Sequence, residues 1–444
     1  MRQKRVIQPK LYGHWPGHPL SYEFQAMASI LDGHPVIAGL AWQDLTAKAS
    51  PNAGAPGMDA VSVVKAAVLQ KFMGVSFQKL AFHLADSYSC RAFMAMGPFD
   101  RAPGASTLQE NVSAIQARTW EAINRLLMGW AKVNGIEAGG KMRFDRTPVE
   151  ANIHRPTDSS ILNDLVRVIC RTLKKARLPK SFRFQDRRRV AKKLAFNIAQ
   201  ATTDQKRKSL YQKLIRHGED LYQEVLDIAL RIDDGRQALV EKLTRWLSLM
   251  QKVIDQTRQR VLLGKSLPAG QKVVSIFETH ADILGKGHRE TVFGHKICLA
   301  GGASGLITDC TIEYGNPADS ELAPKMIVRH KGIFGQPPRQ AAFDGGFASK
   351  PNLKAFKAYG VEDVAFHKKR GLEIADMVKS SWVYKQLRNF RAGIEGNIST
   401  LKRAFGSSRC NWRGRENFLA YVWTSILAYN LVALARRCMD KGLF

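Results

Sequence analysis

Three acidic residues have neighbours suited to the chemistry of phosphate esters. Asp145 lies in the apolar stretch "KMRFDRTPVE", and Asp344 precedes a pair of glycines in "AAFDGGFAS". Glu395 lies in "RNFRAGIEGNISTLKRAFG", four residues after Arg391 and seven before Lys402. Steps of four and seven place these last three side chains on one face of a predicted helix. On that face the carboxylate could bind a metal while the two cations receive phosphates.

Together the three acids would form a metal site for phosphoryl transfer. Clustered carboxylates repel one another, and two Mg²⁺ ions would neutralise them and keep positions open for phosphate and water. Two such ions stabilise both the attacking and the leaving oxygen of an in-line displacement. Each acid alone also fits an ordinary role, Asp145 and Asp344 as turn or cap residues and Glu395 in a surface ion pair. Their order along the chain favours the catalytic interpretation.

The elements around the acids are expected to place them at the edge of a sheet. Asp145 follows a Gly-Gly break in a short predicted strand, and Pro148 should prevent that strand from becoming long. Asp344 ends a second strand, where open α/β sheets bind ligands, and its two glycines would let a phosphate approach closely. Between them we predict a strand at 271–278 and a hairpin from "ETVFGHKICLAGG" and "GLITDCTIEYG".

The N-terminal region is predicted to be irregular over 1–55, apart from a short helix at 22–31, and helical afterwards. From Met58 the apolar periodicity is that of helices, and a break at Gly74 gives a helix, a short turn and a second helix. This is the outline of a helix-turn-helix, which could contact DNA or be a plain packing unit. One further helix is expected from Ser106 to about Val133.

The charge of the chain indicates a polyanionic partner. The net charge is +30 and the pI about 10.1, an excess that favours nucleic acid over an anionic membrane. Between Leu165 and Arg216 there are seventeen Lys and Arg and two Asp. We interpret this helical segment as a phosphate-binding surface that includes Arg187, Arg188 and Arg189; the alternative is a solvated helical bundle. A loop containing Lys368, Lys369 and Arg370 has the same two interpretations.

Neither the cysteines nor the apolar C-terminal segment indicates an extracellular or membrane protein. The six cysteines lack zinc-site or redox-motif spacing, so we expect reduced, buried thiols in a cytoplasmic protein. The segment "FLAYVWTSILAYNLVALA" (418–435) is uncharged. Its aromatic residues lie inside it rather than at its ends, so we predict a buried packing helix and no membrane contact.

These blocks, in this order, resemble the DDE transposases of bacterial insertion sequences, in particular the group called ISNCY. "FDRTPVEANIHRPTDSSIL" resembles the first-aspartate block, "AAFDGGFAS" the second, and "RAGIEGNISTLKRAFGSSRCNWRG" the glutamate block. In the last, Arg391, Glu395 and Lys402 complete the R-x3-E-x6-K pattern, whereas Arg388 stands where the family often has Tyr. After the first aspartate, Arg146 stands where many relatives have a small hydroxyl residue, which would place a long cation beside the metal site.

The resemblance implies a fold class, a site and a reaction. The fold would be an α/β, RNase H-like mixed-sheet catalytic domain with five strands, an N-terminal helical domain and a large basic helical insertion. Asp145, Asp344 and Glu395 would be both the catalytic residues and the ligands of Mg²⁺, with Mn²⁺ as the alternative. Arg391, Lys402 and Arg388 would lie near DNA phosphates.

The implied activity is cleavage at transposon ends followed by strand transfer into target DNA. The partners would be these two DNAs and further copies of the chain, in a synaptic homodimer or larger assembly at the nucleoid of the bacterial cytoplasm. Two other classes stay open: a catalytically silent DNA-binding repressor, and a metal-dependent nuclease that does not join DNA.

The expected domain boundaries follow from these assignments. They are, in chain order, a helical, DNA-binding domain (1–138), the first-aspartate segment of the catalytic core (139–160), the basic insertion (161–269), the core segment with the second aspartate and the glutamate (270–415) and a C-terminal packing helix (416–444).

Overall fold

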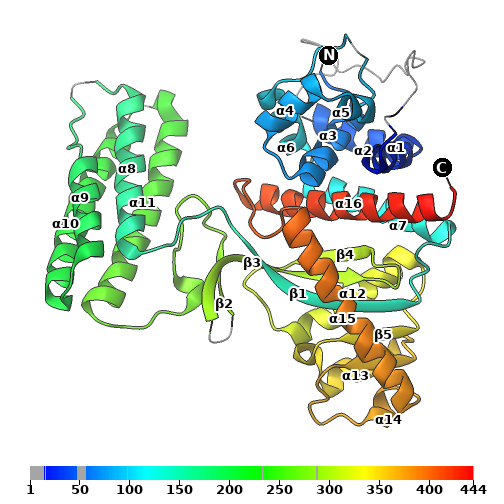
Figure 1. Ribbon diagram of the computed structural model, residues 1–444. Coiled ribbons are helices and arrows are strands. Elements are labelled where there is room, and N and C mark those ends of the chain that lie inside the picture. Colours follow the sequence, from blue (N-terminus) through cyan, green and yellow to red (C-terminus); the bar gives the residue numbers. More distant parts are fainter. Residues whose placement is uncertain are drawn as a thin grey trace. The chain divides into compact units, whose positions relative to one another are not determined.

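The computed structural model divides into two compact units (Figure 1). It describes residues 15, 17–47, 57–97, 99–179, 181–232, 234–286 and 289–443. The first unit comprises Met1–Glu150 and His295–Phe444, and the second comprises Ala151–Gly294. The three acids all belong to the first unit, and the second unit is a continuous insertion between two parts of the first.

The N-terminal part of the first unit is helical. Its helices are α1 (Pro19–Asp32), α2 (Pro35–Thr46), α3 (Ala60–Met73), α4 (Phe77–Asp86), α5 (Tyr88–Phe93), α6 (Ala105–Ala114) and α7 (Ala117–Val133). The predicted break at Gly74 is confirmed, because this residue ends α3 in the left-handed conformation with a φ of 63°. The chain bends by 104° between α3 and α4, an angle within the range of a helix-turn-helix.

Two predictions for this region were wrong. Helix α1 includes the predicted short helix at 22–31, but the rest of the stretch within 17–47 is not irregular, because α1 is longer and α2 also forms. Each of the two begins with a proline in its first turn, where a missing N–H costs nothing; residues 1–14, 16 and 48–56 lie outside the described chain. The single helix expected from Ser106 to Val133 is broken at Ile115, which is extended and buried. The N–H of the next residue, Gln116, donates to Asp44 Oδ2 at 2.8 Å, which fixes the break.

A mixed sheet of six strands holds the acids. Its strands are β1 (Lys141–Glu150), β2 (Asp282–Lys286), β3 (Arg289–Gly301), β4 (Ile307–Ile312), β5 (Gln340–Phe343) and β6 (Asp363–Phe366). Their order is β2-β3-β1-β5-β6, with β4 paired to β3. The predicted hairpin is confirmed as β3 and β4, which are antiparallel, whereas β1, β5 and β6 are parallel neighbours.

The sequence misjudged two strands. Strand β1 has ten residues and includes Pro148; it pairs with β5 only as far as Phe144, so the ladder to β5 needs no N–H from the proline. The strand predicted at 271–278 does not form, and only a short turn, η3 (Ala269–Gln271), lies there. Its alternating apolar residues Val274 and Ile276 are buried in two different clusters instead of one sheet face.

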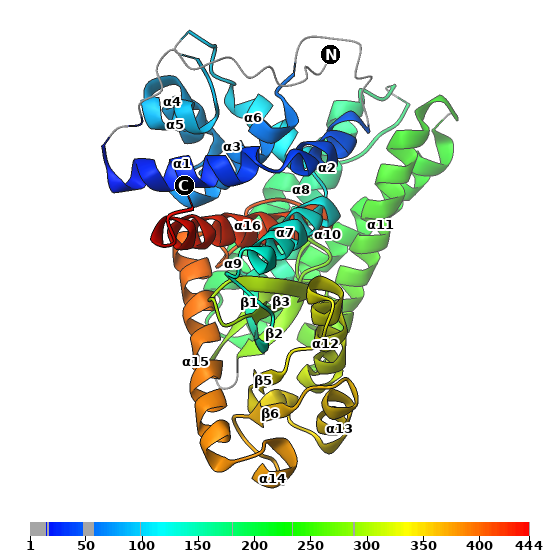
Figure 2. The ribbon, with the colours of Figure 1, turned by 90° about the vertical axis from the view of Figure 1, so that its right-hand side faces the viewer.

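Helices pack on the sheet and on one another within the first unit. They are α12 (Asp319–Phe334), α13 (Lys350–Ala358), α14 (Ile374–Met377), α15 (Ser381–Ala404) and α16 (Arg415–Asp440). The long helix α15 runs along β1, β5 and β6 (Figure 2), and α12 packs against α7, β4 and α13.

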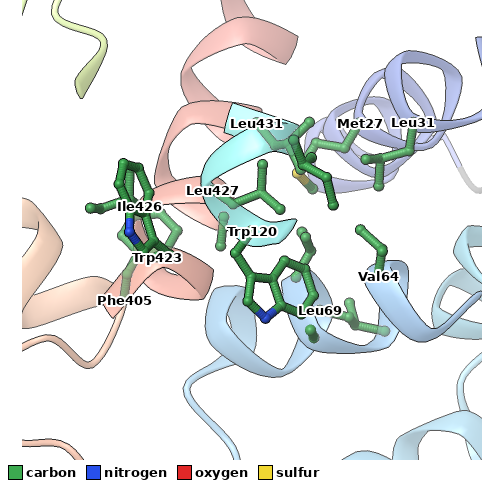
Figure 3. Packing of buried hydrophobic residues seen from close by; sticks show 14 of the residues in the cluster. Met27, Leu31, Val64, Leu69, Trp120, Phe405, Trp423, Ile426, Leu427 and Leu431 are labelled. Carbon is green, nitrogen blue, oxygen red and sulfur yellow. The ribbon is translucent and has the colours of Figure 1, made fainter. Parts of the chain in front are cut away.

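Helix α16 lies in the interior of the first unit. It packs against α7, α1 and α3, and its Leu427 and Leu431 join Trp120 and Met27 in one apolar cluster (Figure 3). The helix is long and apolar enough to cross a membrane, but 83% of its most apolar window is buried in the protein. Its composition therefore follows from its place in the core.

The second unit is a helical bundle. It contains α8 (Asp158–Ala176), α9 (Arg188–Gln200), α10 (Asp204–Arg231), η1 (Asp234–Arg236), α11 (Gln237–Thr257) and η2 (Arg258–Leu262). Helix α8 packs on α9, α10 and α11 around one apolar core. At its start, Thr157 and Ser160 form a capping box.

A buried asparagine joins α16 to the sheet. The side chain of Asn430 accepts from the Ile307 N–H at 2.9 Å and donates to the Ile307 carbonyl at 2.7 Å. It also donates to Asn124 Oδ1 at 2.7 Å. We expect Asn430→Leu to lower the free energy of unfolding by about 2–4 kcal/mol, because two buried backbone groups lose their partner. Urea denaturation measures this. Asn417→Leu, which removes only a bond to the Arg413 carbonyl near the surface, should have a much smaller effect, and equal effects would contradict the assignment.

Candidate active site

The register of two parallel strands places both aspartates at the same edge of the sheet. Phe144 of β1 pairs with Phe343 of β5, and Asp145 and Asp344 are the next residues along the chain. Because the strands run in parallel and their ladder ends at this pair, the two aspartates lie side by side where β5 ends, whereas β1 continues to Glu150. Asp344 also begins a short turn, η4 (Gly345–Phe347), that leads the chain away from the sheet.

A single guanidinium nitrogen contacts all three acids. Arg391 Nη2 lies 2.9 Å from Glu395 Oε1, 3.4 Å from Asp145 Oδ2 and 3.7 Å from Asp344 Oδ1. Helix α15, which carries the arginine and the glutamate, packs directly on β1 and β5. The structure therefore brings together three carboxylates that are separated by up to 250 residues in the sequence.

The acids differ in their exposure to solvent. The side chain of Asp145 is 20% exposed, that of Asp344 41% and that of Glu395 59%. Burial raises the pKa of Asp145, and the charges of Asp344 and Glu395 raise it further, whereas the Arg146 N–H and the Arg391 guanidinium oppose this shift. Asp145 thus forms the floor of the site, and the other two acids face the solvent.

A buried arginine holds α15 against β1. Arg143 precedes Asp145 by two residues, and its Nη1 donates to the Phe390 carbonyl at 2.6 Å. Its guanidinium also lies 4.6 Å from the centre of the Phe390 ring. A Cβ atom on Gly393 would lie 2.0 Å from Arg143 Nη1, so the helix can approach this closely only with glycine there. Through these contacts Arg143 sets the position of Arg391 and Glu395 relative to Asp145.

Two family models match the chain. The one described as "Transposase DDE domain" matches residues 267–431, and the one described as "Transposase domain (DUF772)" matches residues 16–114. The chain belongs to the DDE transposases of the insertion-sequence type. The searches of curated proteins and of solved structures found no match. Membership of the ISNCY group stays a prediction.

The matched ranges fit the structure of the transposase. The DDE match includes Asp344 and Glu395 and most of the sheet, whereas Asp145 lies outside both matches. The mixed sheet with its flanking helices is consistent with the RNase H-like fold that the sequence predicted, although it has six strands rather than five. The family implies that this transposase is an enzyme that acts on DNA and uses a divalent metal.

The donor set suits that metal, although the carboxylates are arranged around an arginine. Among the residues that the structure describes, no group of three or more His, Cys, Asp and Glu side chains has a metal-binding arrangement. The position between the three carboxylates is instead occupied by a cationic nitrogen of Arg391. Carboxylate oxygens around a cation are the ligands that Mg²⁺ prefers, so the residues fit a divalent ion once the guanidinium moves aside.

The glycines after Asp344 serve protein packing. A Cβ on Gly345 would lie 2.7 Å from Lys368 Cβ, and one on Gly346 would lie 2.4 Å from Asp319 Oδ2. The prediction that the pair leaves room for a phosphate was therefore wrong, because protein side chains fill that space. The same packing brings Lys368 beside the turn that follows Asp344.

The side chain of Arg146 was predicted to be a cation beside the metal site, but it is bound by other residues. It donates through its side chain to Asp319 Oδ1 at 2.6 Å, to the Pro317 carbonyl at 2.7 Å and to Asn316 Oδ1 at 2.8 Å. The side chain is 5% exposed and ties β1 to the segment before α12. Only its backbone N–H, which donates to Asp145 Oδ1 at 2.7 Å, belongs to the site.

The cations predicted to bind DNA near the site lie on two elements. Lys368, Lys369 and Arg370 are exposed in the loop after β6. Arg388 is exposed on α15, 5.9 Å from the Tyr384 ring centre, and Lys402 is partly buried on the same helix.

The cations predicted in the insertion are mostly neutralised by its own acids. Arg187 is buried and forms two 2.7 Å hydrogen bonds to Glu224, which raise the pKa of the arginine. Arg188 binds Asp186 in the same bidentate manner, whereas Arg189 is exposed. The burial of Arg187 contradicts its predicted contact with phosphate, because the guanidinium has a structural partner.

Sequence reasoning missed Arg143 and Gly393. A signal was present for each: Arg143 and Asp145 share a strand face because side chains alternate, and a glycine inside a helix is costly without a packing reason. Neither signal shows that Arg143 and Gly393 contact each other, because the strand and the helix lie about 250 residues apart in the sequence.

The contact at Gly393 can be tested by adding one methyl group. Gly393→Ala should lower the free energy of unfolding by about 1–3 kcal/mol, because Arg143 must give way. Thermal unfolding measures this. The matched control is Gly396→Ala on the same helix, where nothing lies within 4 Å of the new Cβ, and which should be neutral or stabilising by up to about 1 kcal/mol. Equal destabilisation by both substitutions would refute the role of Gly393 in the contact between Arg143 and α15.

Proposed function

We propose that the transposase cuts DNA at transposon ends and joins the freed 3′ ends to target DNA, with Asp145, Asp344 and Glu395 as catalytic residues and metal ligands. The observation that carries this proposal is the convergence of the three carboxylates on one nitrogen of Arg391. A cluster of acids at a sheet edge is destabilising unless a cation neutralises it. Such a cluster suits the binding of divalent ions.

Each residue of the site has a chemical task in this proposal. Bound divalent ions would supply Lewis-acid stabilisation of the attacking and leaving oxygens. Asp145 anchors the site from its half-buried floor, and the exposed Asp344 and Glu395 meet the DNA from the solvent side. Arg391 would turn from the acids to a phosphate. Its buried Nε has no hydrogen-bond partner within the described residues, so it can donate to such an acceptor.

The surrounding cations would bind the DNA strand. Arg388 and Lys402 lie before and after the site on α15. The loop with Lys368, Lys369 and Arg370 approaches Asp344 through the packing of Lys368 on Gly345. We assign these residues to phosphates, because a phosphodiester attracts cations without regard to sequence.

The remaining features of the proposal follow from the reaction. Mg²⁺ is the proposed ion, with Mn²⁺ as the alternative. The joining of two transposon ends requires both in one complex, so we propose a synaptic homodimer or larger assembly. The place of action is the bacterial cytoplasm at the nucleoid, where the DNA lies.

Removal of any one carboxylate should abolish the chemistry and spare DNA binding. Asp145→Asn, Asp344→Asn and Glu395→Gln should each lower the rate of strand cleavage at least about 1,000-fold, because a metal ligand that contributes several kcal/mol is lost. Cleavage and joining of labelled transposon-end DNA with Mg²⁺ are measured on a denaturing gel. The control is Glu373→Gln, an exposed acid outside the site.

The same assay separates the alternatives. Cleavage without joining would establish a nuclease, and DNA binding without cleavage by the wild-type chain would establish a repressor. Undiminished joining after any of the three substitutions would overturn the assignment of that residue.

Metal binding can be measured without DNA or turnover. Mg²⁺ at about 100 times its dissociation constant should stabilise the wild-type chain by about 2.7 kcal/mol, because the ion binds the folded state. Thermal unfolding with and without Mg²⁺ measures the shift. The double variant Asp145→Asn with Asp344→Asn should show no shift, and an equal shift in this variant would place the ion elsewhere.

A further inference from the structure

We infer that the helical insertion binds the phosphate backbone of DNA in a hollow between α8 and α11, an inference that rests on the proposed action of the transposase on DNA. These two helices pack side by side in the second unit (Figure 1). The hollow between them has a volume of about 600 Å³. Its lining includes the cations Arg171, Lys175, Arg236 and Lys242 and the apolar residues Val168 and Leu239.

Among the lining residues that the structure describes, the charged ones are all cations. They are Arg171, Lys175, Arg236 and Lys242. All four side chains belong to exposed residues. Arg171 and Lys175 are four residues apart on α8, so they are neighbours on one helix face and repel each other. Such a set of cations is stabilised by a bound anion.

The insertion neutralises many of its other cations but not these. Next to the hollow, Lys174 pairs with Asp186 at 2.8 Å and Arg167 pairs with Asp164 at 2.6 Å. Arg187, Arg207, Arg231, Arg258 and Arg260 also pair with acids of the same unit. Within the described chain, Arg171, Lys175 and Lys242 have no ion pair. Three exposed cations without an ion pair therefore lie together at this hollow, whereas others of the insertion, such as Lys206 and Lys208, lie elsewhere.

The backbone around the hollow adds to the field. Helix α11, which is 21 residues long, begins beside it at Gln237, and the residue before it forms no side-chain cap. Free N–H groups at a helix start attract anions. The opposing carbonyl end of α8 is neutralised, because Arg236 Nη1 donates to the Ala176 carbonyl at 2.8 Å.

The shape of the hollow favours a polymer of phosphates over a small anion. Its lining includes the apolar residues Val168 and Leu239, and its cations come from α8, η1 and α11. Successive phosphates of one DNA strand can pair with such separated cations, while the sugars between them contact the apolar lining residues. We therefore assign the hollow to the backbone of duplex DNA.

Removal of two cations tests the assignment. Lys175→Gln with Lys242→Gln in the full chain should weaken binding to a fluorescent duplex of random sequence roughly tenfold, and should reduce the slope of log K against log[NaCl] by about 2. Fluorescence anisotropy over a series of NaCl concentrations measures both. Thermal unfolding should be unchanged, because both side chains are exposed.

The matched control is Lys206→Gln with Lys208→Gln, two exposed lysines on α10 that do not line the hollow. An unchanged slope in the hollow variant would overturn the inference. An equal reduction in the control would do so as well, because diffuse charge would then explain the binding. The measurement is repeated with the DNA at the two ends of the element, which brackets the open reading frame. A loss confined to that DNA would show that the hollow holds transposon ends, and an equal loss with random DNA would show that it holds DNA in general.

The result is independent of the proposed chemistry. A wild-type chain that binds DNA through the hollow but does not cleave it would refute the proposed function and leave this inference standing. Normal cleavage together with unchanged DNA binding by the hollow variant would refute this inference and leave the proposed function standing.

Discussion

The ion pairs of Arg391 are the constraint on which the arrangement of the catalytic unit depends. Three carboxylates at one sheet edge repel one another, and one guanidinium nitrogen within 3.7 Å of all three offsets this repulsion. The arrangement requires β1 and β5 in the observed register and α15 at a fixed position along both. The positions of the sheet strands, of α15 and of the three carboxylates therefore depend on one another through these ion pairs.

Glycines allow the segments around the site to approach one another closely. Gly393 lets Arg143 bind the backbone of α15, Gly345 lets the loop of Lys368 approach Asp344, and Gly346 leaves room for Asp319. At each position a methyl group would meet an atom at less than 3 Å. The glycines near the acids thus allow the close packing of the protein around the site. The exposed carboxylates and the surrounding cations are the residues that DNA can contact.

The charge of the chain is distributed unevenly between structure and surface. Arg143 and Arg187 are buried, the side chain of Arg146 is 5% exposed, and all three hold segments together through hydrogen bonds. The cations of the α8–α11 hollow are exposed and unneutralised. The cations behind the net charge of +30 are therefore not equally available to DNA. Some are engaged within the protein, and others are exposed together on its surface.

The sequence by itself determined which residues could do chemistry, namely Asp145, Asp344 and Glu395, together with the strands and the helix that carry them and the β3–β4 hairpin. These follow from local periodicity, turn residues and spacing, whereas the family followed from the resemblance of the sequence blocks to known transposases. The sequence could not show that Val274 and Ile276 are buried in separate clusters, that Pro148 is tolerated within β1, or that Arg187 is sequestered by Glu224. Only the tertiary structure decided these points, together with the roles of Arg143 and Gly393, because each depends on a partner brought near by folding, and local pattern carries no information about such partners.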